Sequence, residues 1–169
     1  YSIQAIRAAA KAGAESVHLC DTNGGSMPEE IAAGVKSVLS AVEIPVGIHA
    51  HNDCGLAVAN SLAGIDAGAS FVQGTVNGFG ERCGNANLVT IIANLLLKKN
   101  NVYELLLPDS LSSLTRLSRY VDEVLNVKPS TRQPYVGRSA FTHKGGMHVS
   151  GISRDTAAYE HVSPEKVGN

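Results

Sequence analysis

The chain has 169 residues, of which 44% are hydrophobic and 17% are charged, and its formal net charge is -1 at pH 7. This composition is ordinary for a globular protein, and the balanced charge gives no reason to expect nucleic acid or an anionic membrane as a partner. No run of about 18 apolar residues spans a membrane and no leader precedes the first helix, so we expect a cytoplasmic protein.

The first third of the chain predicts two helices around one strand. Residues 2–12 carry apolar side chains at helical spacing and end at Gly13, which suits the C-terminal end of a helix. A short buried strand is expected at residues 16–22. A proline followed by two glutamates at residues 28–30 is typical of a helix start, and this helix should run to about residue 41.

Strand and helix then alternate twice more. The expected strands are residues 46–50 and 71–76, and the expected helices are residues 56–67 and 87–99. The phrases at residues 12–17 (AGAESV) and 67–72 (AGASFV) are near copies, and each joins a helix end to a strand. Such steps predict an α/β fold with a parallel sheet covered by helices. We favour a (β/α)8 barrel over an open doubly wound sheet, although a full barrel needs about 250 residues.

The pattern changes after the helix that ends near residue 99. Residues 109–125 read as an amphipathic helix capped by Asp109 or Ser110. Its apolar stripe, which we expect to serve packing, consists of Leu111, Leu114, Leu117, Val121, Val124 and Leu125. Residues 130–169 are predicted to be irregular, and the glycine-rich run 141–148 within them reads as a loop.

Polar side chains follow the predicted strands, where the carboxyl ends of parallel strands form the ligand side of the sheet. His49 and His51 lie two apart and should point to one face, as metal ligands would; the alternative is two polar residues that end a strand. Two imidazoles suit Zn, Mn or Co and tolerate Mg. Such a metal would bind an α-keto acid, with Thr22 on its carboxylate. Glu81 beside Arg82 is either an acid/base or a structural ion pair.

Two motifs in this region resemble a known family. Residues 49–53 (HAHND) and 77–86 (NGFGERCGNA) are similar to the paired signatures of the α-isopropylmalate, homocitrate and citramalate synthases. These are metal-dependent (β/α)8 enzymes that condense acetyl-CoA with an α-keto acid. Residues 19–25 (LCDTNGG) and 142–148 (THKGGMH) are most similar to the citramalate synthase branch, whose keto acid is pyruvate and which serves branched-chain amino-acid biosynthesis.

The resemblance implies a site, a cofactor and partners. The implied residues are the metal contacts His49, His51 and Asn85, the keto-acid contact Thr22, and the catalytic residues Glu81 and His148. His143 is a weaker match. The implied cofactor is a divalent metal ion (Mn, Mg, Zn or Co), and acetyl-CoA is the co-substrate. A base would deprotonate the acetyl methyl group, the resulting carbanion would attack the keto carbonyl, and water would hydrolyse the thioester.

The resemblance also implies an architecture. Residues 1–100 would form the last three βα units of a TIM barrel, and residues 101–169 a truncated linker subdomain that reaches a partner subunit in a homodimer. Family members carry an earlier Arg-Asp pair, and their further tyrosine is expected beyond Asn169. We therefore expect a fragment that is inactive by itself. The alternatives are a 2-isopropylmalate or homocitrate synthase, or a non-catalytic half-barrel whose role is assembly.

Overall fold

A computed structural model of the chain describes residues 2–99, 102–103, 105, 107 and 109–169. The chain divides into two compact units, residues 1–91 and residues 92–169. The division falls inside the helix α4 (Leu88–Lys98), whereas the boundary that we predicted, between residues 100 and 101, lies outside the described residues. Within the described part of the chain, no helix is both long enough and apolar enough to cross a membrane.

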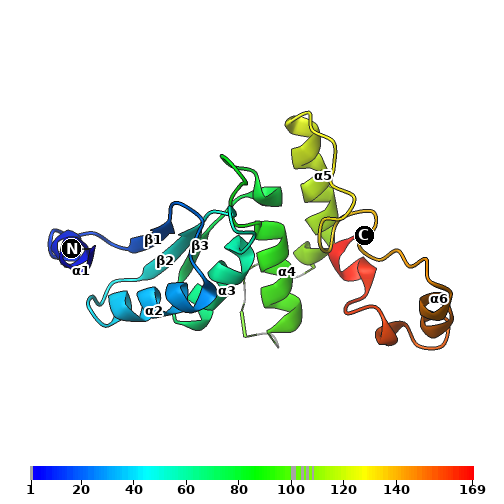
Figure 1. Cartoon of the computed structure of the whole chain (residues 1–169), viewed down its shortest axis with the longest axis horizontal. Helices are drawn as coiled ribbons and strands as arrows, with labels where there is room; N and C mark the ends of the chain where they lie inside the picture. Colours follow the sequence, from blue (N-terminus) through cyan, green and yellow to red (C-terminus); the bar gives the residue numbers. More distant parts are fainter. Residues whose placement is uncertain (1, 100–101, 104, 106, 108) are drawn as a thin grey trace. The chain divides into compact units, whose positions relative to one another are not determined.

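The first unit is a three-stranded parallel sheet with helices between its strands (Figure 1). Its elements before α4 are α1 (Ser2–Lys11), β1 (Val17–Asp21), α2 (Pro28–Leu39), β2 (Val46–Ala50), α3 (Ala57–Asp66), β3 (Phe71–Gln73) and the 3-10 helix η1 (Val76–Gly78). The strands lie in the order β1-β2-β3, and both pairs are parallel. The predicted α/β fold with a parallel sheet is confirmed.

The core lies between the sheet and its helices. Val46 and Ile48 of β2 are 0% exposed and belong to one cluster with Val35 and its apolar neighbours on α2. A Cβ atom on Gly64 of α3 would lie 3.2 Å from Cγ2 of Ile48, so glycine lets this helix pack closely on the strand. Burial of Val46 and Ile48 fixes which face of β2 points to the core. Side chains alternate along a strand, so His49 points to the opposite face.

That opposite face is open, which corrects one prediction. Across the strands it carries His18, His49 and Phe71, and Phe71 is 46% exposed. We expected β1 to be a buried strand, but only Asp21 in it is buried. Among the described residues, β1 and β3 each have one strand partner, so their outer edges and this face lack the cover that a closed barrel supplies to its interior.

The third strand ends earlier than the predicted range 71–76. It ends at Gln73, because the chain then turns away from β2. A Cβ atom on Gly74 would overlap the carbonyl oxygen of Ala86, and the amide of Thr75 donates to that same oxygen at 3.0 Å. The backbone of residues 74–75 therefore pairs with the segment that leads into α4.

The second unit is built from short helices and connecting segments. They are η2 (Ser110–Ser113), α5 (Leu114–Val124), α6 (Gly146–Ile152), η3 (Thr156–Ala158) and η4 (Pro164–Val167). The predicted helix 109–125 is thus a 3-10 turn followed by α5, and no side-chain cap forms at Asp109 or Ser113. The prediction of a loop at residues 141–148 is wrong at its end, since α6 begins at Gly146 and contains His148.

Helix α5 buries its polar side. Its buried residues are Leu114, Thr115, Ser118 and Asp122. The hydroxyl of Thr115 donates to the carbonyl oxygen of Val167 at 2.8 Å, which ties α5 to η4. Leu117, Val124 and Leu125 of the predicted packing stripe are 43%, 64% and 49% exposed. The predicted role of this stripe in packing is therefore wrong for these three residues, because hydrogen bonds hold the other side of α5 against the unit.

Candidate active site

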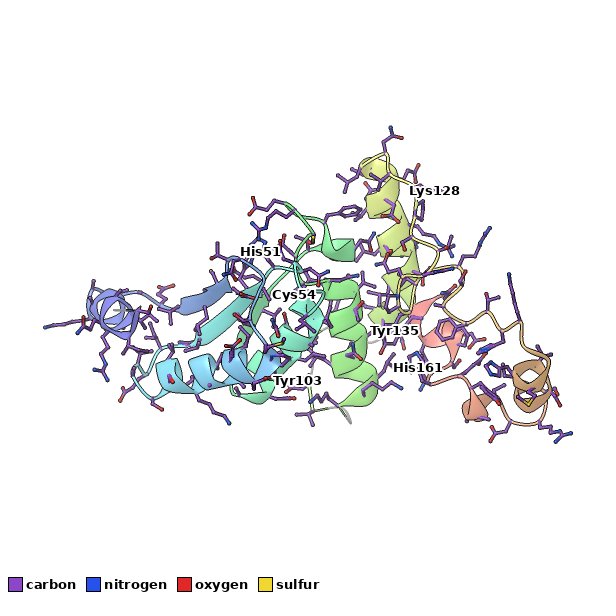
Figure 2. All side chains as sticks on the ribbon, viewed as in Figure 1. His51, Cys54, Tyr103, Lys128, Tyr135 and His161 are labelled. Atoms are coloured by element: carbon purple, nitrogen blue, oxygen red, sulfur yellow. The ribbon has the colours of Figure 1, made fainter. Side chains whose placement is uncertain are left out.

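The two histidines of the first motif converge at the carboxyl end of β2. His49 lies within this strand, His51 follows it, and their ring centroids are 5.1 Å apart at an angle of 74°. Figure 2 shows His51 at this end of the sheet. His51 is 8% exposed, and the Nδ1 atoms of both rings are buried with no hydrogen-bond partner among the described residues. The structure thus brings the imidazoles together, as their spacing predicts.

A tightly folded loop carries Asn85 to the same place. Left-handed backbone conformations occur in it at Asn77, Gly78, Arg82 and Gly84. The loop closes on the end of β2, where His51 and Asn85 form an antiparallel bridge. The side-chain nitrogen Nδ2 of Asn85 lies 3.2 Å from Nε2 of His49. A Cβ atom on Gly80 would overlap Oδ1 of Asn85, so only glycine leaves room for this carboxamide.

The surroundings of His49 favour its neutral form. Burial lowers the pKa of His49, and positive charge on His51 and on His18 lowers it further. A neutral ring keeps a lone pair for a cation, and two imidazoles with a carboxamide suit a divalent ion of the borderline type. The unpartnered ring nitrogens fit that role, because a buried polar atom without a partner is costly. The described residues hold no group of three or more His, Cys, Asp or Glu that could bind a metal, so further ligands must complete the shell.

His18 is a third imidazole on this face that our sequence reasoning missed. It lies opposite Gly47 in the register of β1 and β2, and a Cβ atom on Gly47 would overlap its ring. The ring centroid of His18 is 5.9 Å from that of Phe71, and its Nδ1 atom is buried without a partner among the described residues. Cys20 lies opposite His49 in the register of β1 and β2, and His18 lies two residues before Cys20, so its side chain points to the same face. The sequence alone does not give this register.

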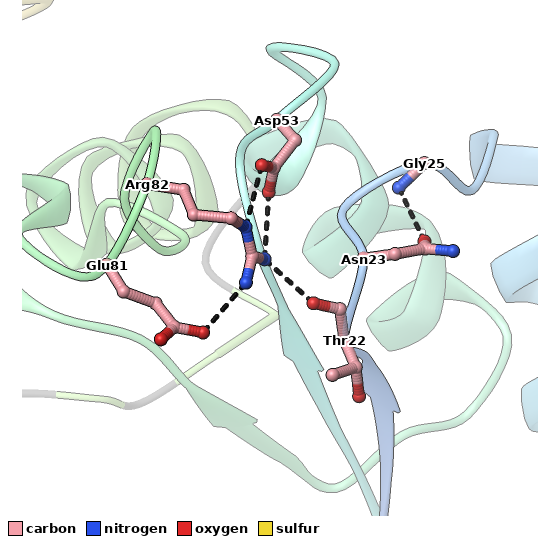
Figure 3. A network of polar contacts seen from close by, with 6 residues as sticks. All are labelled: Thr22, Asn23, Gly25, Asp53, Glu81 and Arg82. Carbon is pink, nitrogen blue, oxygen red and sulfur yellow. Dashed lines mark hydrogen bonds and ion pairs between the residues drawn. The ribbon is translucent and has the colours of Figure 1, made fainter.

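Arg82 joins the ends of two strands to the loop of Asn85 (Figure 3). Its guanidinium donates to both carboxylate oxygens of Asp53, at 2.9 and 3.1 Å, and to Glu81 at 2.7 Å. It also donates to the main-chain oxygen of Thr22 at 2.7 Å. These hydrogen bonds lower the pKa of Asp53 and raise that of Arg82. A bidentate arginine of this kind fixes geometry as well as charge.

The network clarifies two predicted site residues and adds one. Glu81 forms an ion pair with Arg82, and its side chain is 68% exposed. Thr22 contributes its carbonyl oxygen to the network and is exposed, so its hydroxyl is accessible to a ligand. Asp53 is the added residue; it belongs to the first motif, and the signal for it is its place two residues after His51. Figure 3 also shows that the side-chain oxygen of Asn23 accepts a hydrogen bond from the backbone amide of Gly25 in the turn after Thr22.

A buried polar cluster holds the turn after β1. The carboxylate of Asp21 is buried and accepts the hydroxyl of Ser26 at 2.9 Å. Asn60 on α3 is 0% exposed. Its side-chain amide donates to the carbonyl oxygen of Ser26 at 2.8 Å and lies 3.5 Å from the carboxylate of Asp21. These hydrogen bonds hold the turn on which Thr22 is presented, while Oδ1 of Asn60 is buried with no hydrogen-bond partner among the described residues.

Two histidines of the second unit, His143 and His148, form an aromatic cluster with Tyr159, whereas His161 packs against Tyr135 and Phe141. The ring of His148 on α6 stacks on Tyr159 with centroids 4.5 Å apart. His143 lies 6.3 Å from each of these rings. The structure therefore brings His143 and His148 together, while the pairing of His148 with Glu81 stays a prediction. We assigned no role to Tyr159 from the sequence, and the structure shows it only as a packing partner of His143 and His148.

The fold and site define a class: a partial (β/α) barrel with its polar side chains at the carboxyl ends of the strands. The sequence profile described as HMGL-like matches residues 1–121, and the homocitrate synthase post-HMGL domain-like profile matches residues 135–169. The chain belongs to the HMGL-like family.

Individual relatives agree with this assignment. The chain is 52% identical to an (R)-citramalate synthase of Geobacter sulfurreducens over 169 residues, which are 100% of this chain and 32% of the relative. It is 38% identical to a 2-isopropylmalate synthase of Heliobacterium modesticaldum, over 95% of this chain and 32% of that protein. The fold resembles the HMG-CoA lyase of Bacillus subtilis with a TM-score of 0.65 and 21% identity, over 76% of this chain and 44% of that one. The chain spans about a third of the length of these synthases.

Proposed function

We propose that the chain forms part of an acyltransferase that condenses acetyl-CoA with pyruvate to give citramalate. The observation that carries the proposal is its similarity, over its whole length, to five proteins named (R)-citramalate synthase at 47–52% identity. The 2-isopropylmalate synthase of Heliobacterium modesticaldum is less similar, at 38%. We therefore assign pyruvate, rather than a larger keto acid, as the acceptor, and place the enzyme in branched-chain amino-acid biosynthesis in the cytoplasm.

The histidine pair and Asn85 support a metal-dependent version of this reaction. His49 and His51 would hold a divalent ion through ring nitrogens, and Asn85, 3.2 Å from His49, would contact it or orient the ring. When bound, such an ion supplies a Lewis acid that polarises the carbonyl group of the keto acid. The donor set suits Mn, Zn or Co, and Mg with water ligands.

The remaining residues would bind the substrate and move its protons. The hydroxyl of Thr22 would donate to the carboxylate of pyruvate, and Arg82 would hold Thr22 in place through its carbonyl oxygen. We assign proton transfer to Glu81 and His148: a base takes a proton from the acetyl methyl carbon, which then bonds to the keto carbon of pyruvate. Hydrolysis of the thioester by water releases coenzyme A.

We also propose that the enzyme is a homodimer. The exposed apolar side chains of Leu117 and Val124 on α5 and of Leu125 just after it support this assignment, since exposed groups of large apolar residues mark interaction surfaces. Light scattering after size exclusion tests it. A monomer at micromolar concentration would rule the dimer out.

The test of the activity is a thiol-release assay on the complete enzyme with acetyl-CoA and Mn²⁺ or Mg²⁺. Three acceptors are compared: pyruvate, 3-methyl-2-oxobutanoate and 2-oxoglutarate. We expect release of coenzyme A with pyruvate to exceed release with the other two, and His49→Ala to abolish it. Preference for the second or third acceptor would indicate an isopropylmalate or homocitrate synthase instead. Absence of release with all three would refute the proposed function.

A further inference from the structure

The second unit contains a hollow that the proposed acyltransferase chemistry does not use. It has a volume of about 500 Å³ and lies between residues 118–122 of α5 and the segment that follows this helix. Figure 2 shows Lys128 just after α5 and Tyr135 further along this segment. The hollow is within the range of small-molecule sites, which are about 300–1,000 Å³. All of its lining residues lie between Ser118 and Arg138.

Three cationic side chains line this hollow. They are Arg119 on α5, Lys128 after it and Arg138 at the far wall, and each is exposed. In the described part of the chain none of these three side chains forms an ion pair. The carboxylate that lines the hollow is that of Asp122, which is buried in α5. The hollow therefore carries an excess of positive charge.

The wall that presents Arg138 is held rigidly. Tyr135, Val136 and Gly137 are buried, and a Cβ atom on Gly137 would overlap the backbone of residues 131 and 133. The side-chain amide of Asn169 donates to the carbonyl oxygens of Tyr135 and Gly137 at 2.9 and 3.0 Å. The hydroxyl of Tyr135 donates to Asn94 at 2.9 Å. A ligand would meet a preformed surface, which reduces the entropic cost of binding.

We propose that this hollow is a binding site for a phosphate group, either free phosphate or the phosphate ester of an organic ligand. Two guanidinium groups and one ammonium group match the charge of a phosphate dianion, and guanidinium donates to phosphate oxygens in pairs. The hydroxyls of Ser130 and Thr131 supply further donors on the same lining. The proposal does not depend on the acyltransferase activity.

The first test is calorimetric titration of the chain with inorganic phosphate and with adenosine 3′,5′-bisphosphate. The double variant Arg119→Gln with Arg138→Gln should weaken binding of at least one of them by about tenfold or more, because each guanidinium makes charge-assisted hydrogen bonds. The matched control is Arg132→Gln, an exposed arginine in the same segment that does not line the hollow. It should bind as the unsubstituted chain does.

A second test needs no substitution and so does not depend on the variant folding. Phenylglyoxal modifies accessible arginines, and mass spectrometry reports which of them a ligand protects. Phosphate should slow modification of Arg119 and Arg138 and leave that of Arg132 unchanged.

Tighter binding of the bisphosphate than of phosphate would identify an organic ester as the ligand, and equal binding would identify phosphate alone. No binding at millimolar concentration, equal protection of all three arginines, or equal loss in variant and control would overturn the proposal.

Discussion

Gly80→Ala perturbs the candidate metal site without changing any of its donor groups. A Cβ atom at this position would overlap Oδ1 of Asn85 and lie 2.9 Å from its Cγ atom. The backbone of Gly80 is not left-handed, so alanine meets no backbone strain there, and the effect is purely steric. The carboxamide of Asn85 must therefore move away from the 3.2 Å contact that it makes with Nε2 of His49.

The expected size of the effect follows from what the carboxamide does. If Asn85 orients the ring of His49 or contacts the ion, its displacement should weaken divalent metal binding by about 10- to 100-fold, as loss of such supporting groups typically does. Overpacking of the loop should also lower the free energy of unfolding by about 1–3 kcal/mol. The two effects are measured separately, the first by competition with a chelating dye for Mn²⁺ or Zn²⁺ and the second by urea denaturation.

The matched control is Gly146→Ala. Nothing lies within 4 Å of a Cβ atom at this glycine, which also has no left-handed backbone and begins α6. It should bind metal like the unsubstituted chain, whereas His49→Ala should set the baseline for a lost ligand. Equal metal affinity of Gly80→Ala and Gly146→Ala would show that Asn85 has no part in the metal site, and the reasoning would fail.

Three further outcomes test the core, the pH dependence and the second unit. Ile48→Ala, at a fully buried position, should lower the free energy of unfolding by about 2–5 kcal/mol in urea, whereas the exposed Val124→Ala should change it by about 0.5 kcal/mol or less. Because the folded pKa of His49 lies below the ordinary histidine value of 6.5, the unfolded chain binds more protons near that pH, so stability should be full above it and decline below it. Urea unfolding at several pH values tests this, and His49→Gln should flatten the decline. In the complete enzyme, His148→Ala should depress kcat and leave the KM for pyruvate unchanged, and an unaltered kcat in steady-state assays would remove its catalytic role.

Elements with a strong pattern were predictable. The strand at residues 46–50 has its predicted bounds, since an apolar run bordered by proline and polar residues is a clear strand signal. The helix start at Pro28 was equally clear, and the carboxylate of Glu30 indeed accepts the amide of Met27 at 2.8 Å. The convergence of His49 and His51 required only the period of two in a strand.

Features that depend on tertiary contacts were not predictable from pattern. Helix α5 has an apolar stripe at helical spacing, and the usual expectation is that this stripe is buried. The structure buries Leu114 of this stripe but leaves Leu117, Val124 and Leu125 exposed. It also buries Thr115, Ser118 and Asp122, and the hydroxyl of Thr115 donates to the carbonyl oxygen of Val167. The early end of β3 has the same kind of cause, a backbone pairing between Thr75 and Ala86 that no local periodicity encodes.

The loop of Asn85 explains why the two motifs of the first unit belong together. The period of two in a strand is enough to place His49 and His51 on one face. Asn85 reaches them only because the loop reverses direction through several left-handed residues. Arg82 adopts one of these conformations, with a φ angle of 53°, and from there it bonds Asp53 of the first motif and the carbonyl oxygen of Thr22. The same arginine therefore stabilises the loop and links it to the segments that follow β1 and β2. Loss of the charge of Arg82 should disturb both the position of Asn85 and the position of Thr22. The two motifs therefore form one connected site rather than two independent ones.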